Sequence, residues 1–242
     1  MSTSSIRSNP SIIKKEEEMK RSTLLLGIAT LSLIAATQTL GAVSNGKLDE
    51  VLEKMERAAR GIKTIEADMN QEKRDMQIGG KEIYRGRIFF SHSKACDKVR
   101  INYSIPEGQV VGVICNDIYL YQPSIKQVII TSRRAQASKN QEFSFIATPY
   151  KSVPELKSQY DIVYLGEEQG TAKLELTPKA ASSVKKLTLW VDQSSWLPTK
   201  YQVVEKNNNV TTFTLNGMKL NGGLDGNIFK ITWPKDTKEL RK

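Results

Sequence analysis

The sequence predicts a mainly β protein built around one wide antiparallel sheet, with an amphipathic helix in front of it. Three observations lead to this fold class. Short segments with an apolar residue at every second position recur along the chain, as in half-buried β-strands. Turn residues separate these segments every ~8–12 residues, which is typical of antiparallel sheets and barrels. One long region, residues 44–61, instead has the apolar spacing of a helix.

The N-terminal stretch has the order of a secretory signal peptide. The basic pair Lys20-Arg21 precedes an apolar run over residues 24–36, and small and polar residues follow. The run is shorter than the roughly 20 residues that span a bilayer; an anchor that stays uncleaved is the alternative. We therefore predict that residues 19–42 are a signal peptide.

The residues before this signal do not fit an export sequence. Residues 1–18 are polar and include a run of three Glu, so we predict that Met19 is the biological start and residues 1–18 are a start-site artefact. No long linker divides the rest, which predicts a single domain over residues 43–242. The three candidate cleavage positions follow Gly41, Ala42 and Ser44.

The charge balance is basic and diffuse. The net charge is +10, from 36 basic and 26 acidic residues; loss of residues 1–42, with five basic and three acidic side chains, leaves +8. A diffuse positive surface suits acidic proteins or phospholipid head groups. The sequence has no glycine-rich phosphate loop, zinc spacing or aromatic-basic RNA signature, so nucleic acid is not an expected partner.

The predicted helix begins at an N-cap, Ser44 or Asn45, and ends at Gly61. Its apolar residues recur at the i, i+3, i+4, i+7 spacing of one helix face, and Glu, Lys and Arg occupy the opposite face. The apolar face consists of Leu48, Val51, Leu52, Met55 and Ala59.

After Gly61 the period changes to two, and about eleven strands are expected between residues 64 and 234. The alternation stops at a polar loop after Ser132, and two short helices are predicted around residues 142–147 and 153–159. The last predicted strand covers residues 227–234, where Pro234 ends the run.

A sheet of this width cannot stay flat, so it twists and curls into a wide barrel. Alternation makes its concave face apolar, and the helix together with the segment around Phe143 and Phe145 is available to cover it. The residues expected to line the covered space are Leu52, Met55, Ile88, Phe90, Val99, Ile101, Tyr103, Phe143, Phe145, Leu174, Leu176, Leu189, Phe213, Phe229, Ile231 and Trp233.

The two cysteines, Cys96 and Cys115, lie on opposite sides of the turn that contains Pro106. Export into an oxidising compartment favours a disulfide between them. Their alternation argues against it, because Cys115 shares parity with Val113 whereas Cys96 is out of parity with Val99, which puts them on different faces. The sequence leaves the pairing open.

Catalytic chemistry is not indicated. The single histidine, His92, stands between two serines with no nucleophile motif around it. Glu167 and Glu168 fall in a polar turn, where a solvated pair is expected. Two cysteines and one histidine do not make a metal site. We therefore expect neither an enzyme nor a cofactor or metal.

The order of several segments resembles the periplasmic outer-membrane lipoprotein carrier family, called LolA-like. The resemblance runs from about Asn45 to Pro234. In the first half it rests on GRIFF (residues 86–90), VRINYSIP (99–106) and IYLYQP (118–123). In the second half it rests on LELTPK (174–179), KLTLWVD (186–192), LPTKYQVV (197–204) and NGMKLNGGLDGNIFKITWP (216–234).

The resemblance implies an unclosed eleven-stranded barrel with a helical lid, acting as a monomer in the periplasm. Its cavity would hold the acyl chains of a lipoprotein, taken from an inner-membrane ABC release complex and handed to an outer-membrane receptor. The alternatives are a carrier of another lipid or acylated pigment, a lipid-binding sensor that regulates a membrane protein, and a small barrel whose interior is packed.

The sequence departs from the family at one position. Well-known members carry an Arg-Pro pair whose Arg fastens the lid to helix carbonyls, and this chain has none in the corresponding stretch, residues 89–103. The candidate substitutes are His92, Lys94 and Lys98. Arg100 is offset by one from Ile101 and is expected to point outward.

Overall fold

The computed structural model describes residues 31–132 and 152–242, with side chains from residue 46 onward. The chain divides into two units, Met1–Lys47 and Leu48–Lys242. Helix α2 covers Leu31–Arg60, so the predicted start at Ser44 or Asn45 is wrong. Residues 31–43 are rich in Leu and Ala and contain no proline, which lets the helix continue through the expected cap. Its predicted end is confirmed, since Ile62 N donates to Ala59 O.

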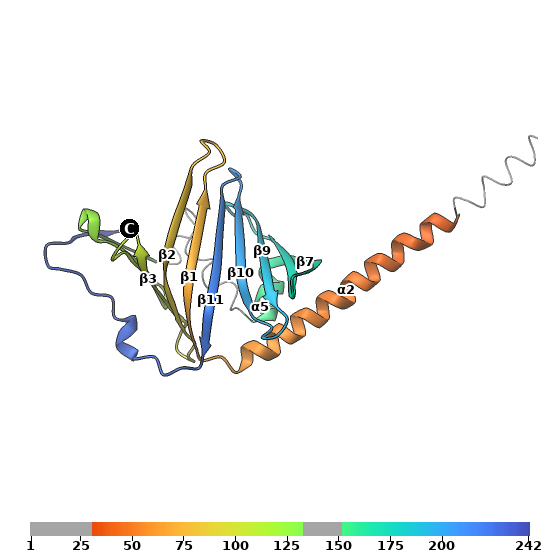
Figure 1. Cartoon of the computed structure of the whole chain (residues 1–242), viewed down its shortest axis with the longest axis horizontal. Coiled ribbons are helices and arrows are strands. Elements are labelled where there is room, and N and C mark those ends of the chain that lie inside the picture. The colour runs from red at the N-terminus through yellow and green to blue at the C-terminus, as the bar shows by residue number, and fades with distance from the viewer. Residues whose placement is uncertain (1–30, 133–151) are drawn as a thin grey trace, which may run out of the picture. The chain divides into compact units, whose positions relative to one another are not determined.

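In the described part of the chain, no helix is both long and apolar enough to cross a membrane. The strands there number twelve, and eleven of them fall where the alternation predicts (Figure 1). They are β1 Thr64–Arg74, β2 Lys81–Ser91, β3 Lys98–Ile105, β4 Val110–Ile114, β5 Asp117–Gln122, β6 Gln127–Ser132, β7 Tyr160–Glu168, β8 Thr171–Pro178, β9 Val184–Asp192, β10 Pro198–Glu205, β11 Val210–Leu220 and β12 Lys238–Arg241.

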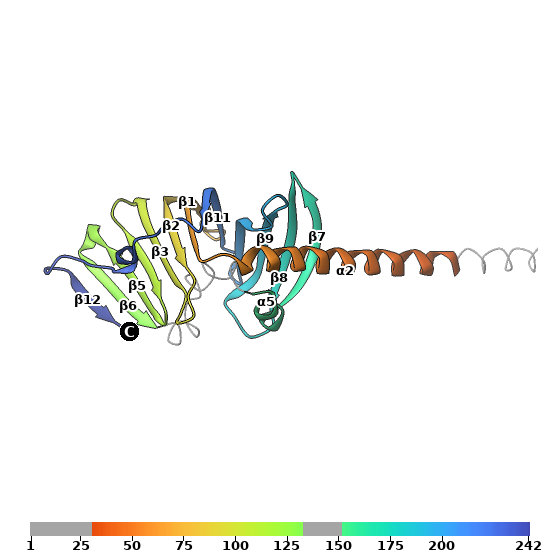
Figure 2. The ribbon, with the colours of Figure 1, turned by 90° about the horizontal axis from the view of Figure 1, so that it is seen from below.

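All twelve strands form one sheet in the order β12-β6-β5-β4-β3-β2-β1-β11-β10-β9-β8-β7. The pairing of β12 with β6 is parallel, and the other pairs are antiparallel. The two end strands, β12 and β7, are not neighbours, so the sheet curls without closing, as Figure 2 shows. The predicted unclosed antiparallel barrel is confirmed.

The core lies on one side of this sheet, called the inner face below. Strand residues of one parity, such as Ile65, Ile101 and Leu189, are at most 1% exposed there. Helix α2 packs against them with Val51, Leu52 and Met55, all part of the same buried cluster. Burial of apolar surface on this scale is the main term that stabilises the fold.

The short helix predicted around residues 153–159 is confirmed as α5, Val153–Gln159. Ser152 caps it by accepting from Glu155 N, and Pro154 occupies the first turn, where a missing N–H costs nothing. The other short helix, predicted at residues 142–147 with Phe143 and Phe145, lies outside the described residues.

The last predicted strand is wrong. Residues 227–234 do not pair with a strand; the chain forms a 3₁₀ turn, η3, over Gly226–Phe229 and then runs without regular structure to β12. Asp225 caps η3 by accepting from Asn227 N. The alternation of Phe229, Ile231 and Trp233 has another cause, described with the site.

Cys96 and Cys115 form a disulfide, with their Cα atoms 5.2 Å apart. The parity argument against it does not apply, because both cysteines lie beyond the strand ends. Cys96 precedes β3, and Cys115 follows β4 in a turn with φ +56°. The bond ties the loop after β2 to the turn between β4 and β5.

Candidate functional site

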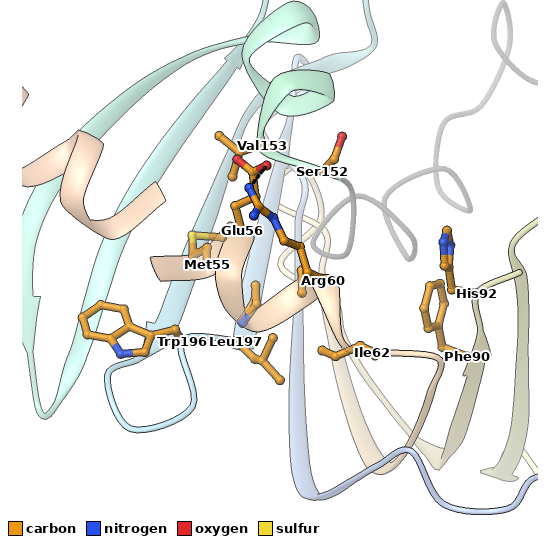
Figure 3. Close-up of a pocket in the computed structure, with 12 residues that line it drawn as sticks. Met55, Glu56, Arg60, Ile62, Phe90, His92, Ser152, Val153, Trp196 and Leu197 are labelled. Carbon is orange, nitrogen blue, oxygen red and sulfur yellow. Dashed lines mark hydrogen bonds and ion pairs between the residues drawn. The ribbon is translucent and has the colours of Figure 1, made fainter. Parts of the chain in front are cut away.

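A pocket of about 210 Å³ lies between the last turns of α2, the start of α5, the end of β2 and the turn between β9 and β10 (Figure 3). These elements are far apart in sequence and meet at one end of the inner face. The lining residues are Met55, Glu56, Ala59, Arg60, Ile62, Phe90, His92, Ser152, Val153, Trp196, Leu197 and Pro198.

The pocket has an apolar interior and a polar rim. Met55, Val153 and Leu197 are at most 7% exposed, so they form its inner walls. At the rim Arg60 pairs with Glu56 at 3.2 Å, one helical turn apart. The interior can take up an apolar chain while the rim stays in contact with water and a polar head.

The turn between β9 and β10 supplies one side of the rim. The Asp192 carboxylate accepts from the backbone N–H and hydroxyl of Ser194 and Ser195, at 2.5–3.1 Å. The hydroxyl of Ser194 contributes most to lowering the pKa of Asp192 below its ordinary value. This network holds Trp196 with φ +56°. The Nζ of Lys54, on α2, lies 4.2 Å from its ring centroid.

Helix α5 is attached by two buried side chains and by polar pairs at the surface. Val153 and Leu156 are buried against the core. Lys157 Nζ lies 3.2 Å from Asp49 on α2, and Lys179 Nζ donates to Lys157 O at 2.7 Å. The side chains of these pairs are roughly half exposed or more. Exposed pairs of this kind contribute ~0–1 kcal/mol each, so the buried side chains of Val153 and Leu156 are the main attachment of α5.

Most of the residues predicted to line a cavity lie on the inner face, as expected, but inside a packed cluster. Of these, Met55 and Phe90 also line the pocket. Ile101, Leu174, Leu176 and Leu189 are 0% exposed and are surrounded by other core side chains. The inner-face members of the predicted set are Leu52, Met55, Ile88, Phe90, Val99, Ile101, Tyr103, Leu174, Leu176, Leu189 and Phe213.

Sequence reasoning missed the other apolar walls, which come from loops and element ends. The signal was present after β9, where Trp196 and Leu197 are apolar residues in a turn and Pro198 begins β10. Ile62 and Val153 carried no comparable signal, because each is a single apolar residue at the end of a helix.

The prediction that Phe229, Ile231 and Trp233 line the cavity is wrong, because they cover the opposite, outer face of the sheet. A Cβ added to Gly112 would lie 1.9 Å from the Ile231 side chain. Since Gly112 alternates with the core residues Val111 and Val113, its Cβ direction points away from the core.

The residues paired with Gly112 in the neighbouring strands face the same segment. Trp233 packs against Tyr119 with ring centroids 6.4 Å apart, and Phe229 is 8% exposed. Tyr119 pairs with Gly112 in the sheet register. We call residues 224–237 the outer strap, since they run from β11 to β12 across the outer face of β3–β5 (Figure 2).

Arg100 points away from the core, as predicted, and fastens this strap. Its guanidinium donates to Asn102 Oδ1 at 2.6 Å, to Ile228 O at 2.6 Å and to Lys230 O at 3.2 Å. Burial under the strap lowers the pKa of Arg100 from its ordinary value. Hydrogen bonds from a charged donor are stronger than those between neutral groups. The two bonds from Arg100 to backbone carbonyls therefore attach the strap firmly to β3.

The three candidate lid latches are placed differently. His92 lines the pocket, but its Nδ1 lies 2.7 Å from Asp97 Oδ1 in its own loop. Lys94 and Lys98 do not line the pocket. Among the described residues none of the three bonds to α2 or α5, so a latch role for them stays a prediction. In that same part of the chain no three His, Cys, Asp or Glu side chains gather to hold a metal ion.

Comparison with known families gives this site a context. A family model described as outer membrane lipoprotein carrier protein LolA matches residues 60–232, well over half of the chain. This chain belongs to the LolA family. LolA-like proteins are carriers and binding proteins rather than enzymes, with a fold that binds lipid or lipoprotein cargo. The match includes the pocket walls that follow α2.

Several solved structures are similar to this chain at low identity, and one of those described here has a TM-score above 0.5. An uncharacterized conserved protein from Thermus thermophilus has a TM-score of 0.51 at 14% identity, over 81% of this LolA-family chain and 99% of the other. A lipoprotein-sorting protein domain from Vibrio parahaemolyticus has a TM-score of 0.48 at 16% identity, over 74% and 94%. MucB in its complex with MucA from Pseudomonas aeruginosa has a TM-score of 0.45 at 14% identity, over 76% and 60%. A comparison with curated protein sequences finds no match.

Proposed function

We propose that this LolA-family protein is a periplasmic carrier that takes the acyl chains of lipoproteins into the pocket beneath α5 and moves them from the inner to the outer membrane. The observation that carries the proposal is an apolar pocket with a polar rim beside the first turn of α5. No bond is made or broken in such a cycle. Binding needs apolar surface that exchanges water for acyl chain.

The size of the pocket bears on how cargo enters. Its volume of about 210 Å³ is below the ~300–1,000 Å³ of typical small-molecule sites. Each buried methylene contributes ~0.8 kcal/mol to the binding free energy. Binding of a longer acyl chain therefore favours a conformation in which the pocket is wider. We propose that α5 moves outward when cargo enters and returns when it leaves, which makes the two states differ in cargo affinity.

The N-terminal segment completes the proposal. Residues 19–42 would be removed on export, leaving residues 43–242 as the carrier. The boundary between the two units after Lys47 is compatible with this division. The partners are then an inner-membrane ABC release complex, which supplies the lipoprotein, and an outer-membrane receptor, which accepts it. The carrier would act as a monomer.

The first test identifies the cargo. The protein is purified from a periplasm and its bound molecules are identified by mass spectrometry. Acylated lipoproteins in the eluate support the proposal. Phospholipid or another lipid alone would favour a different lipid carrier. Empty protein that also fails to bind a fluorescent fatty acid would contradict both.

The second test uses two neighbouring alanines on α2. Ala59 lines the pocket and Ala58 does not, although both are partly exposed. Ala59→Trp should fill the pocket and reduce fatty-acid affinity about tenfold or more, a loss of ~1.4 kcal/mol, whereas Ala58→Trp should bind like the unmodified protein. Equal loss in both variants, at equal thermal stability, would place the acyl chain elsewhere.

A further inference from the structure

A second candidate binding surface lies on the outer face of the sheet, away from both the pocket and the outer strap. Strand register aligns six residues in one row across six neighbouring strands, from β2 to β8. The row reads Arg85, Asn70, Thr214, Lys200, Trp190 and Lys173. We call it the cationic row.

All six members point away from the core. Five of them have at least one buried inner-face neighbour in the strand, and Arg85 follows Tyr84, which is partly buried and packs against the core. Asn70, for example, lies between Met69 and Gln71, which are 1% and 4% exposed. The row contains three cations and no carboxylate. Among the described residues, neither Arg85 nor Lys200 has a carboxylate within ion-pair distance, while Lys173 is 3.6 Å from Glu168 at the end of the row.

Trp190 stands between two of these cations. Lys173 Nζ and Lys200 Nζ lie 5.0 and 4.3 Å from its ring centroid. They come from the strands on either side of β9, so each covers one face of the indole. The indole Nε1 is 3.4 Å from Glu168. The ring is fixed with its edge outward, an arrangement common where tryptophan anchors a protein partner.

The surface around the row is hollow. An open depression of about 840 Å³ is lined by Arg85, Asn70, Thr214 and Lys200, and also by Arg74 and Glu72; the Glu72 carboxylate pairs with Arg74 and Lys81. An adjoining cavity of about 290 Å³ shares Thr214 and Lys200 and reaches Trp190. The neutral members of the row, Asn70 and Thr214, offer both hydrogen-bond donors and acceptors. A chain that lies along the hollow could therefore be held by its backbone and by its acidic side chains.

We infer that the cationic row is a docking surface for an extended acidic segment of a partner protein. At ~4.8 Å per strand, Arg85 and Lys200 are about 14 Å apart along the row, which an extended peptide spans in roughly four residues. A flat anionic bilayer would not follow a hollow. Single-stranded nucleic acid that binds by stacking needs an open aromatic face, and the Nζ atoms of Lys173 and Lys200 lie over the Trp190 ring. This inference does not depend on the pocket or on acyl chains.

The test measures binding of a fluorescein-labelled peptide of alternating Glu and Ser to the full chain, by fluorescence anisotropy. The charge-reversal pair Arg85→Glu with Lys200→Glu should weaken binding about tenfold or more. The matched control, Lys185→Glu with Lys235→Glu, makes the same change in net charge at exposed positions outside the row and should weaken it less than about twofold. The indole N–H resonance of Trp190, assigned with Trp190→Phe, should shift as the peptide binds.

Four results would overturn the inference. Equal loss in both pairs would mean that only diffuse charge attracts the peptide. Equal binding of the same peptide with Gln in place of Glu would show that acidic side chains are not required. No binding of the Glu peptide at all would show that the row does not dock such a segment. Binding to phosphatidylethanolamine–phosphatidylglycerol vesicles that responds to the Arg85 and Lys200 changes, without a response of the peptide, would assign the row to a membrane instead.

Discussion

On its inner face the sheet is covered by α2 and α5, and on its outer face strands β3–β5 are covered by the outer strap, residues 224–237. Helix α5 is held by two buried residues, Val153 and Leu156, and by exposed pairs such as Lys157 with Asp49. The strap is held by a partly buried guanidinium on two carbonyls and by Ile231 seated over Gly112. The polar attachments of the inner cover are therefore exposed, whereas the polar attachment of the outer cover is partly buried.

This contrast also explains where space is left. Under α5 and the end of α2 the side chains leave a pocket, while the strap fills its contact with the sheet at Gly112. A carrier needs one element that moves and a frame that does not. The proposed mechanism assigns the first role to α5 and the second to the sheet under the outer strap.

The largest expected effect separates the packed part of the inner face from the pocket. Ile101 is 0% exposed, so Ile101→Glu places a carboxylate in the core and should destabilise the fold by more than ~4 kcal/mol. Val163→Glu, at a 52% exposed position on the edge strand β7, should change stability by less than ~0.5 kcal/mol. Urea denaturation measures both. A folded Ile101→Glu that has merely lost lipid binding would show that this residue lines an open cavity.

The next effect concerns the outer strap. Arg100→Met leaves the carbonyls of Ile228 and Lys230 without their donor and should cost about 2–3 kcal/mol. Amide hydrogen exchange in β12 should rise, because the strap leads into that strand. Arg87→Met serves as the control, since Arg87 on the outer face of β2 pairs with Glu66 and Asp68 in exposed positions. It should cost less than ~1 kcal/mol. Equal costs would mean that Arg100 is an ordinary surface charge.

The smallest effect on stability is expected at the inner cover. Lys157→Met removes the pair with Asp49 and should cost about 0.5 kcal/mol or less, yet it should speed the release of a bound fluorescent fatty acid. Arg57→Met removes a similar pair with Glu53 on α2, away from the pocket, and should leave the release rate unchanged. Stopped-flow displacement measures the rates. Identical release from both variants would remove Lys157 from the gating of the pocket.

The sequence predicts the sheet well because alternation is a local signal. Eleven of the strands follow from it, including the return to strand at Tyr160, and α5 was predicted where the alternation breaks. The failure at residues 227–234 shows the limit of the same signal. Alternation of Phe229, Ile231 and Trp233 shows that one side of a segment is buried, not that the segment pairs with a strand.

A clue to the outer strap was present in β2. Ile88, Phe89 and Phe90 are three consecutive apolar residues, so both faces of the strand are covered there. The pocket is less accessible to sequence reasoning, because its walls come from the ends of elements brought together by long-range packing. The disulfide was left open for a related reason: Cys96 and Cys115 lie outside the strands whose parity was used to judge them.

The most direct measurement uses two tryptophans, one at each cover. Trp196 stands on the rim of the pocket and Trp233 lies in the outer strap. Each is replaced in turn by the photo-crosslinking residue benzoylphenylalanine, and the protein is illuminated with a bound acylated lipoprotein. Crosslinks to the acyl chains should form at position 196 and not at position 233. Crosslinks at 233 with none at 196 would place the cargo on the outer face and contradict the proposed carrier mechanism.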